Sequence, residues 1–299
     1  MSRCLYIIGN GFDRYLGIAS SYQDFHKYMI SQWPNGEILS NQLERFFPAL
    51  DDKGNCLLWS DFENALGIMD RENILDYCQI GYNLDDYENL AHYAYDIEDC
   101  PDTYLSSILS DLDACFHTWV NSLAIYGGDT SLPYFEKDAL FFSFNYTETL
   151  EKIFMIPDEK ICHIHGRRHV SDQYIYGHNS NNGETIIGDT FVEDVAYEKI
   201  ENYYHGLYKD MCKHITENRN FFDIIRKSSI NKVIVYGCSL GEIDLPYFTE
   251  INKCISCEAE WFFSVYDKPR DVMAVKRLIK LLGLDIVHCL TFDFVKKQY

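Results

Sequence analysis

The sequence predicts an α/β fold: a Rossmann-like open, mainly parallel sheet with a helical insertion after the first βα unit. Short apolar runs of strand length lie at residues 4–8, 232–236 and 261–266, and each ends at glycine or polar residues. Continuous apolar runs are typical of strands buried on both faces. Helical patterns alternate with the later runs, which indicates parallel strands joined by right-handed crossovers.

The first of these runs is followed at once by a turn that contains two glycines. Glycine lets the backbone turn tightly and come close to a ligand. In an open α/β sheet, a phosphate-bearing ligand lies at the carboxyl end of the first strand, against backbone N–H groups. The candidate nucleotide-binding residues of this turn are Gly9, Asn10, Gly11, Phe12 and Asp13. The alternative is a turn without a ligand, because the dinucleotide fingerprint G-x-G-x-x-G needs glycine where this chain has Arg14.

The long stretch from residue 26 to residue 138 carries no strand signal and reads as mainly helical. We predict one α/β domain over residues 1–299, with a helical insertion at approximately 38–130 that covers the first βα crevice. Pro101 is expected to separate one helix from the next, at 102–123. The acidic residues between 84 and 102 do not fit the spacing of an EF-hand loop, so they indicate a solvated helix face.

The sheet is predicted to resume after this insertion. Strand-like runs lie at 139–144 and 160–164, and residues 174–178 look similar. Residues 191–227 return to a helical pattern, and 284–294 hold a final strand or two.

Polar or glycine residues follow several of the predicted strands. In a parallel sheet all carboxyl ends lie at one edge, so these residues are expected to converge on one crevice. Each of them alone also has a structural explanation, since Asn and Gly are common turn formers. The residues added to the candidate site on this ground are Asn145, His165, Gly166, Gly237, Ser239 and Asp267.

The composition limits the partners and the compartment. A formal net charge of −20 argues against duplex nucleic acid or an anionic membrane as the main partner, because phosphate binding depends on Lys and Arg. No apolar run reaches the roughly 18 residues of a transmembrane helix. We therefore expect a cytoplasmic protein with mostly reduced cysteines. Cys254 and Cys257 lack a second pair at zinc spacing, so no metal is expected.

Four motifs together resemble the AbiH family of bacteriophage abortive-infection proteins, nearly from end to end. They are Gly-Asn-Gly-Phe-Asp at 9–13 with Ser-Tyr-x-x-Phe at 21–25, Phe-Asn-Tyr-Thr-x-Thr-Leu-Glu at 144–151, Ile-His-Gly at 164–166, and Gly-x-Ser-Leu-Gly-x-x-Asp-x-Pro-Tyr at 237–247. More distantly, the same series is similar to the sirtuin-like NAD-binding domains. The chain departs from that pattern at Thr147, where the pattern has Asp, and it lacks the four-cysteine zinc module, so protein deacetylation is not expected.

These resemblances imply an anti-phage abortive-infection effector that binds a dinucleotide and hydrolyses NAD at the nicotinamide glycosidic bond. In this interpretation Asn145 orients the water or the ribose, and His165 accepts a proton. The other implied partners are a phage-derived trigger and a second copy of the chain. The alternative is a nucleotide-sensing or protein-binding module of a defence system without turnover. Asn145 together with His165 favours the enzyme, whereas Thr147 favours the module.

Overall fold

The computed structural model describes residues 3–50, 54, 56–79, 90–125, 134–180, 186–265 and 268–291. The chain divides into two compact units. The α/β unit comprises Met1–Ser21, Val120–Ile175 and Asp210–Tyr299, and the helical unit comprises Tyr22–Trp119 and Tyr176–Lys209. The helical unit is therefore larger than the predicted insertion, because it begins at Tyr22 and includes a second segment of the chain.

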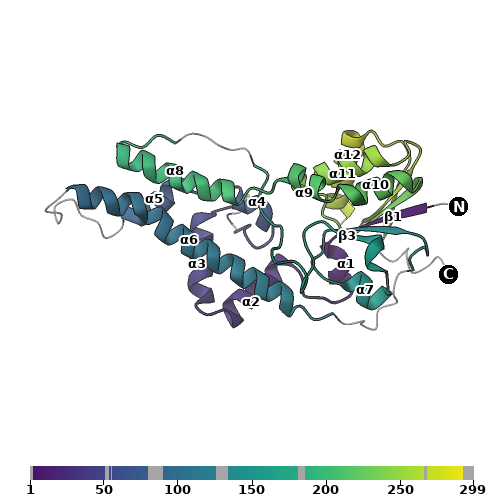
Figure 1. Cartoon of the computed structure of the whole chain (residues 1–299), viewed down its shortest axis with the longest axis horizontal. Coiled ribbons are helices and arrows are strands. Elements are labelled where there is room, and N and C mark those ends of the chain that lie inside the picture. The colour runs from purple at the N-terminus through teal and green to yellow at the C-terminus, as the bar shows by residue number, and fades with distance from the viewer. Residues whose placement is uncertain are drawn as a thin grey trace. The chain divides into compact units, whose positions relative to one another are not determined.

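The α/β unit contains a six-stranded, all-parallel sheet with the order β3-β2-β1-β4-β5-β6, which confirms the predicted fold class (Figure 1). The strands are β1 Arg3–Ile8, β2 Leu140–Ser143, β3 Ile161–His163, β4 Ile230–Tyr236, β5 Glu260–Val265 and β6 Val287–Thr291. The chain adds strands outward from β1 on one side and outward from β4 on the other. The topological switch point, where such sheets bind ligands, thus lies between β1 and β4.

Helices cover both faces of this sheet, as in a doubly wound fold (Figure 1). One face is covered by α1 Asn10–Tyr15 and α7 Thr149–Phe154. The other face is covered by α9 Met211–Glu217, α10 Arg219–Lys227, α11 Leu245–Cys254 and α12 Lys268–Leu282. Two short 3₁₀ segments, η2 Asp158–Lys160 and η3 Glu242–Asp244, lie in the connections.

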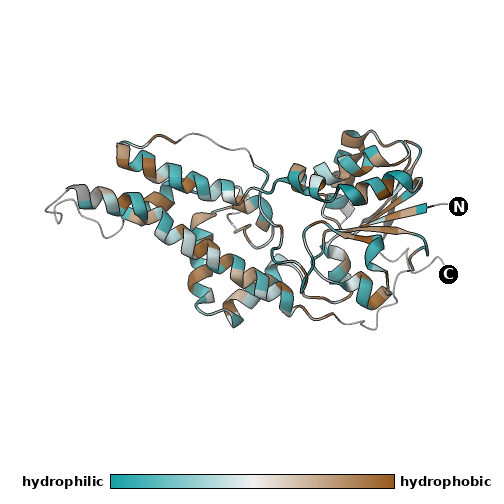
Figure 2. Ribbon diagram, in the orientation of Figure 1, coloured by the Kyte–Doolittle hydropathy of each residue, from teal (hydrophilic) through white to brown (hydrophobic). Residues whose placement is uncertain are grey.

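The first strand shows why an uninterrupted apolar run was needed. Leu5 and Ile7 belong to the hydrophobic cluster under α10 and α11, whereas Tyr6 and Ile8 belong to the cluster on the opposite face. Because side chains alternate along a strand, a strand with a core on both sides is apolar at every position. The strands are accordingly the most uniformly hydrophobic elements of this unit (Figure 2).

The helical unit is built from α2 Tyr22–Gln32, α3 Gly36–Phe46, α4 Phe62–Leu66, α5 Arg71–Gln79, most of α6 Leu90–Ser122, and α8 Phe191–Gly206. Its described residues between 26 and 138 contain no strand, only the isolated bridge between Leu50 and Cys56, as the sequence predicts. Lys199 of α8 pairs with Asp99 and Asp102 of α6 at 2.9 Å each. These carboxylates therefore form a solvated, ion-paired helix face, and the acidic residues before residue 90 lie outside the described residues.

Two predictions, a helix boundary at Pro101 and a strand at residues 174–178, were wrong. Pro101 lies inside α6, which runs on as one helix; the proline removes one backbone donor without ending the helix. Residues 174–178 form no strand, only a single bridge from His178 to Tyr208. Gly177 has φ +140°, and a Cβ there would lie 2.2 Å from the carbonyl oxygen of Leu207. The segment is thus a turn packed closely on another part of the chain.

Residues 191–227, predicted as helical, form the three helices α8, α9 and α10. In the part of the chain that the structure describes, we find no helix with the length and apolarity needed to cross a membrane.

Candidate functional site

The candidate site lies at the carboxyl edge of the sheet, where the turns after the first four strands meet because all strands are parallel. Gly9 directly follows β1 and Gly237 directly follows β4. Asn145 and His165 lie two residues beyond the ends of β2 and β3, which are neighbours in the sheet. Asp267 lies outside the described residues.

The two glycine turns at the switch point pack on one another. The amide of Gly9 donates to the carbonyl of Tyr236 at 2.8 Å, and the amide of Gly11 donates to the carbonyl of Gly237 at 2.8 Å. A Cβ on Gly11 would lie 2.8 Å from Cα of Gly237, and Gly237 itself has φ +64°. The lack of a side chain on these glycines therefore lets the two turns lie close together. The amides of Gly9 and Gly11 already donate hydrogen bonds within the protein.

The side chains of Asn10 and Phe12, both predicted to contact a nucleotide, are also engaged within the protein. The amide nitrogen of Asn10 donates to the carbonyl of Ser20 at 2.9 Å, and the Ser20 hydroxyl donates back to the amide oxygen. The Phe12 ring is buried against Phe135 and Phe154, and its backbone amide donates to the carbonyl of Gly9 at 2.9 Å. Both residues thus stabilise the first βα unit.

Asp13 is a fully buried carboxyl group held by hydroxyl groups. The Thr147 hydroxyl donates to its Oδ2 at 2.5 Å and lies 2.9 Å from the hydroxyl of Thr149. Burial raises the pKa of Asp13 to about 6, although the hydrogen bonds from these threonines oppose the shift. A carboxyl group on α1 therefore ties the first helix to the loop after β2 and titrates close to neutral pH.

Asn145 carries the least satisfied buried side chain of this loop. Its side chain is 5% exposed, and neither its amide oxygen nor its amide nitrogen makes a hydrogen bond of standard geometry among the described residues. The amide does lie close enough to Asp13 to lower the pKa of that carboxyl. A buried polar group with incomplete hydrogen bonding is costly, so it calls for an explanation such as a catalytic role or a bound water.

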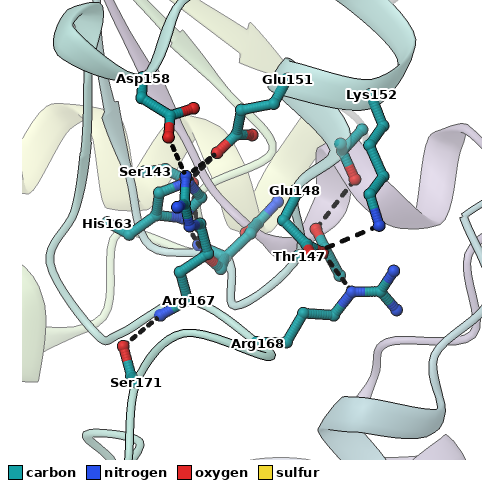
Figure 3. Close-up of polar contacts among 12 residues, drawn as sticks. Ser143, Thr147, Glu148, Glu151, Lys152, Asp158, His163, Arg167, Arg168 and Ser171 are labelled. Atoms are coloured by element: carbon teal, nitrogen blue, oxygen red, sulfur yellow. Dashed lines mark hydrogen bonds and ion pairs between the residues drawn. The ribbon is translucent and has the colours of Figure 1, made fainter.

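A charged network orients the loop that carries Asn145 (Figure 3). His163 Nδ1 donates to the backbone carbonyl of Asn145 at 3.0 Å, and its Nε2 lies 2.9 Å from Oε1 of Glu151. Arg167 bridges Glu151 and Asp158 at 3.0 Å each. Burial acts to raise the pKa of Glu151, but the hydrogen bond and the charge of His163 outweigh burial and lower it. Since a carbonyl only accepts, the Asn145 contact places a proton on Nδ1.

Sequence reasoning missed His163 and its partners. The signal that was available is the pair of histidines at the end of the predicted strand, of which His163 ends β3 and His165 lies in the turn after it. The next arginine, Arg168, points away from Glu151, and its buried guanidinium bonds to Glu148 (Figure 3). It also donates to the carbonyl of Leu123. Two adjacent arginines thus stabilise two different acidic groups.

His165 is 4% exposed and lies among aromatic rings. The centroid of its ring is 5.2 Å from that of Phe144 and 5.8 Å from that of Tyr247. Its Nε2 lies 3.7 Å from Oδ1 of Asp244, a residue of the segment after β4. A histidine next to a carboxylate is an arrangement suited to accept a proton near neutral pH.

The other predicted residues of the edge have different surroundings. Gly166 has φ +93°, so it makes the turn that follows His165. Ser239 is exposed in the segment after β4. The structure therefore places Asn145 with Asp13 and Thr147, and His165 with Asp244, at the same edge of the sheet.

Among the described residues, no group of three or more His, Cys, Asp or Glu side chains is arranged to hold a metal ion.

Comparison with known proteins identifies one family. A family model described as "Bacteriophage abortive infection AbiH" matches residues 5–265, which include every element of the edge described above. No curated protein and no solved structure matches the chain.

Proposed function

The chain belongs to the AbiH family of bacteriophage abortive-infection proteins, and we propose that it acts in phage defence by binding a dinucleotide and hydrolysing NAD at the nicotinamide glycosidic bond. The single observation that carries this proposal is the buried amide of Asn145, which makes no hydrogen bond of standard geometry among the described residues and lies in the turn after β2, next to the strand that precedes His165. Residues on adjacent turns at this edge are where α/β sheets act on their ligands.

The chemistry requires little acid catalysis. As the water oxygen bonds to the anomeric carbon of the ribose, the bond from that carbon to the pyridinium nitrogen breaks. Nicotinamide then leaves as a neutral molecule with the electron pair, and the proton of the water goes to His165. Asn145 would hold the water or a ribose hydroxyl through its amide, which has both a donor and an acceptor. The surrounding rings of Phe144 and Tyr247 keep the position dry.

The phosphates of the dinucleotide are not assigned to the glycine turn. The amides of Gly9, Gly11 and Phe12 donate to carbonyl groups of the protein, and a Cβ on Gly9 or Gly11 would meet protein backbone. The proposal therefore depends on the groups at the ends of β2 and β3, and not on a phosphate loop of the usual dehydrogenase kind.

A second candidate function is a nucleotide sensor without turnover. The burial of Asn145 and His165, which are 5% and 4% exposed, favours this alternative. A substrate reaches groups this deeply buried only when the edge opens. A sensor needs only the small displacement that binding produces.

The test is incubation of the purified full chain with NAD, NADP and ATP, with the products separated by chromatography. An extract of phage-infected cells is added in a parallel series as the source of the trigger. We expect nicotinamide release from NAD and a loss of about 10²-fold or more in His165→Ala and Asn145→Ala, the size typical of a lost proton acceptor or positioning group.

The matched control is His205→Ala, because His205 is an exposed histidine of α8, 3.9 Å from Glu201. Its turnover should equal that of the wild-type protein, and the melting temperature of each variant shows whether it is folded. Intact NAD, NADP and ATP in every series would refute the hydrolase. Binding of NAD without turnover would leave the sensor.

A further inference from the structure

The segment after β4 reaches across the sheet to the candidate site. Two strands, β1 and β2, separate β4 from β3, and adjacent strands lie about 4.8 Å apart, so β4 and β3 are roughly 14 Å apart. Asp244 nevertheless lies 3.7 Å from His165, which follows β3. Residues 238–244, which we term the strap, therefore cross the carboxyl ends of β1 and β2.

The strap has a defined conformation. Leu240 adopts φ +55°, a left-handed backbone that is uncommon for a residue other than glycine. Its carbonyl accepts a hydrogen bond from Arg277 of α12 at 2.6 Å, and the same guanidinium pairs with Glu242 at 2.8 Å. Conformations of this kind persist where surrounding contacts impose them, and they are concentrated at functional sites.

The carboxylate of Asp244 does not cap the helix that follows it. Asp244 is the N-cap residue of α11, and aspartate is a strong N-cap because its side chain accepts a hydrogen bond from the first turn. Here that side chain makes no capping hydrogen bond. It lies instead at the imidazole of His165, and its side chain is 23% exposed whereas that of His165 is 5% exposed.

Aromatic rings also lie around His165. Phe144, Tyr146 and Tyr247 surround the ring with centroids 5.2, 6.3 and 5.8 Å away. The two tyrosines are the remaining titratable groups among these neighbours, and the Tyr146 hydroxyl donates to the carbonyl of Ile175 at 3.0 Å. A separation of 3.7 Å is beyond a hydrogen bond, so the interaction that this geometry allows between Asp244 and His165 is one between charges.

We propose that Asp244 is the positioning residue of His165, brought to it by the strap, and that its charge stabilises the imidazolium that forms when His165 accepts a proton. The inference rests on the proposed function only for the role of His165 as proton acceptor. The pairing itself is a property of the protein without substrate, so it is measurable without turnover.

The experiment is an NMR titration of the full chain with ¹³C-labelled histidine, in which His165→Gln assigns the His165 signal. We expect the pKa of His165 to fall by about one unit in Asp244→Asn, because a nearby negative charge favours the protonated ring. Glu242→Gln is the control: it removes a charge from the same strap, but one that pairs with Arg277. The pKa of His165 should not change in that variant.

A pKa of His165 that is equal in folded Asp244→Asn and wild-type protein would overturn the proposal. Asp244→Ser is the second variant if the asparagine variant does not fold, since serine also removes the charge and is a favourable N-cap residue. Where NAD is hydrolysed, the acidic limb of the kcat profile should move to lower pH in Asp244→Asn, with KM unchanged. If the pKa of His165 shifts in Asp244→Asn but the wild-type protein leaves NAD intact, the hydrolase is refuted and the pairing of Asp244 with His165 is supported.

Discussion

Each unit of the protein holds a carboxylate of a short helix largely away from water, with the Glu63 side chain 15% exposed and Asp13 0% exposed, but the two are compensated differently. In the helical unit, Glu63 lies 2.9 Å from Nζ of Lys209, whose side chain is fully buried, and it also accepts a hydrogen bond from the Tyr22 hydroxyl at 2.8 Å. In the α/β unit, Asp13 accepts a hydrogen bond from the Thr147 hydroxyl. One carboxylate thus has a buried cation beside it, whereas the other is solvated by neutral groups.

This difference indicates a structural role for Glu63 and a candidate functional role for Asp13. A buried ion pair with additional hydrogen bonds holds helices together and keeps both charges. A carboxyl group without such a cation has its pKa raised by burial, to about 6 for Asp13, so it changes charge within the physiological range. Perturbed groups of this kind gather at functional sites, and Asp13 lies beside the unbonded amide of Asn145.

The largest expected effect comes from breaking the ion pair of the helical unit. Lys209→Met leaves the partly buried Glu63 without its buried cation, which should lower the free energy of unfolding by about 3 kcal/mol in chemical denaturation, at the low end of the range for buried pairs. Lys209→Met combined with Glu63→Leu should recover most of this loss. The control is Lys213→Met, which removes a lysine whose side chain is 64% exposed, and its effect should be small. Equal stability of Lys209→Met and wild type would contradict a structural role for the pair.

The next effect is the pH dependence that Asp13 contributes. Its carboxyl has a pKa of about 6 in the folded chain, above the ordinary value of 3.8 for aspartate, so the folded state binds the proton more tightly. This difference in pKa stabilises the folded state by about 3 kcal/mol below pH 3.8, and the stabilisation is lost as the pH rises to about 6.

Asp13→Asn should therefore remove this part of the pH dependence, measured as the free energy of unfolding between pH 4 and pH 8 relative to wild type. Asp138→Asn serves as the control, since the Asp138 side chain is 73% exposed. A difference between Asp13→Asn and wild type that does not vary with pH would show that burial does not perturb Asp13.

The smallest effect compares a glycine of each unit. Gly11→Val places its side chain against the backbone of Gly237, so we expect a loss of about 1–3 kcal/mol in the free energy of unfolding, as for other overpacked positions. Gly206→Ala in α8 adds a Cβ with nothing within 4 Å and should change stability little. A Gly11→Val protein as stable as wild type would mean that the two turns separate easily.

Much of the α/β unit was predictable because its signals are local. An uninterrupted apolar run such as Cys4 to Ile8 is readable without any partner, since a strand with a core on both faces is apolar at every position. The alternation of strands and helices from Ile230 onward similarly predicted parallel pairing. Parallel pairing then places the ends of β2 and β3 at one edge, which is why Asn145 and His165 were predicted to lie at the same edge.

The failures occurred where a distant part of the chain decides the conformation. Pro101 continues a helix that local rules would end, and Gly177 makes a turn because Leu207 packs against it. The glycine turn after β1 resembled a ligand loop, but Gly237 occupies that space. Nothing local to residues 9–13 indicates which atoms fill the space that the glycines leave.

The sequence by itself determined the parallel sheet, the edge at which its polar turns gather, and the largely helical character of the second unit, because hydrophobic periodicity records burial along one element. Only the tertiary structure decided which polar groups meet: the Asp13 carboxyl with Thr147, His163 with the carbonyl of Asn145, and Asp244 with His165. These contacts join residues from different elements, and a hydrogen bond or ion pair depends on distances that no local pattern contains.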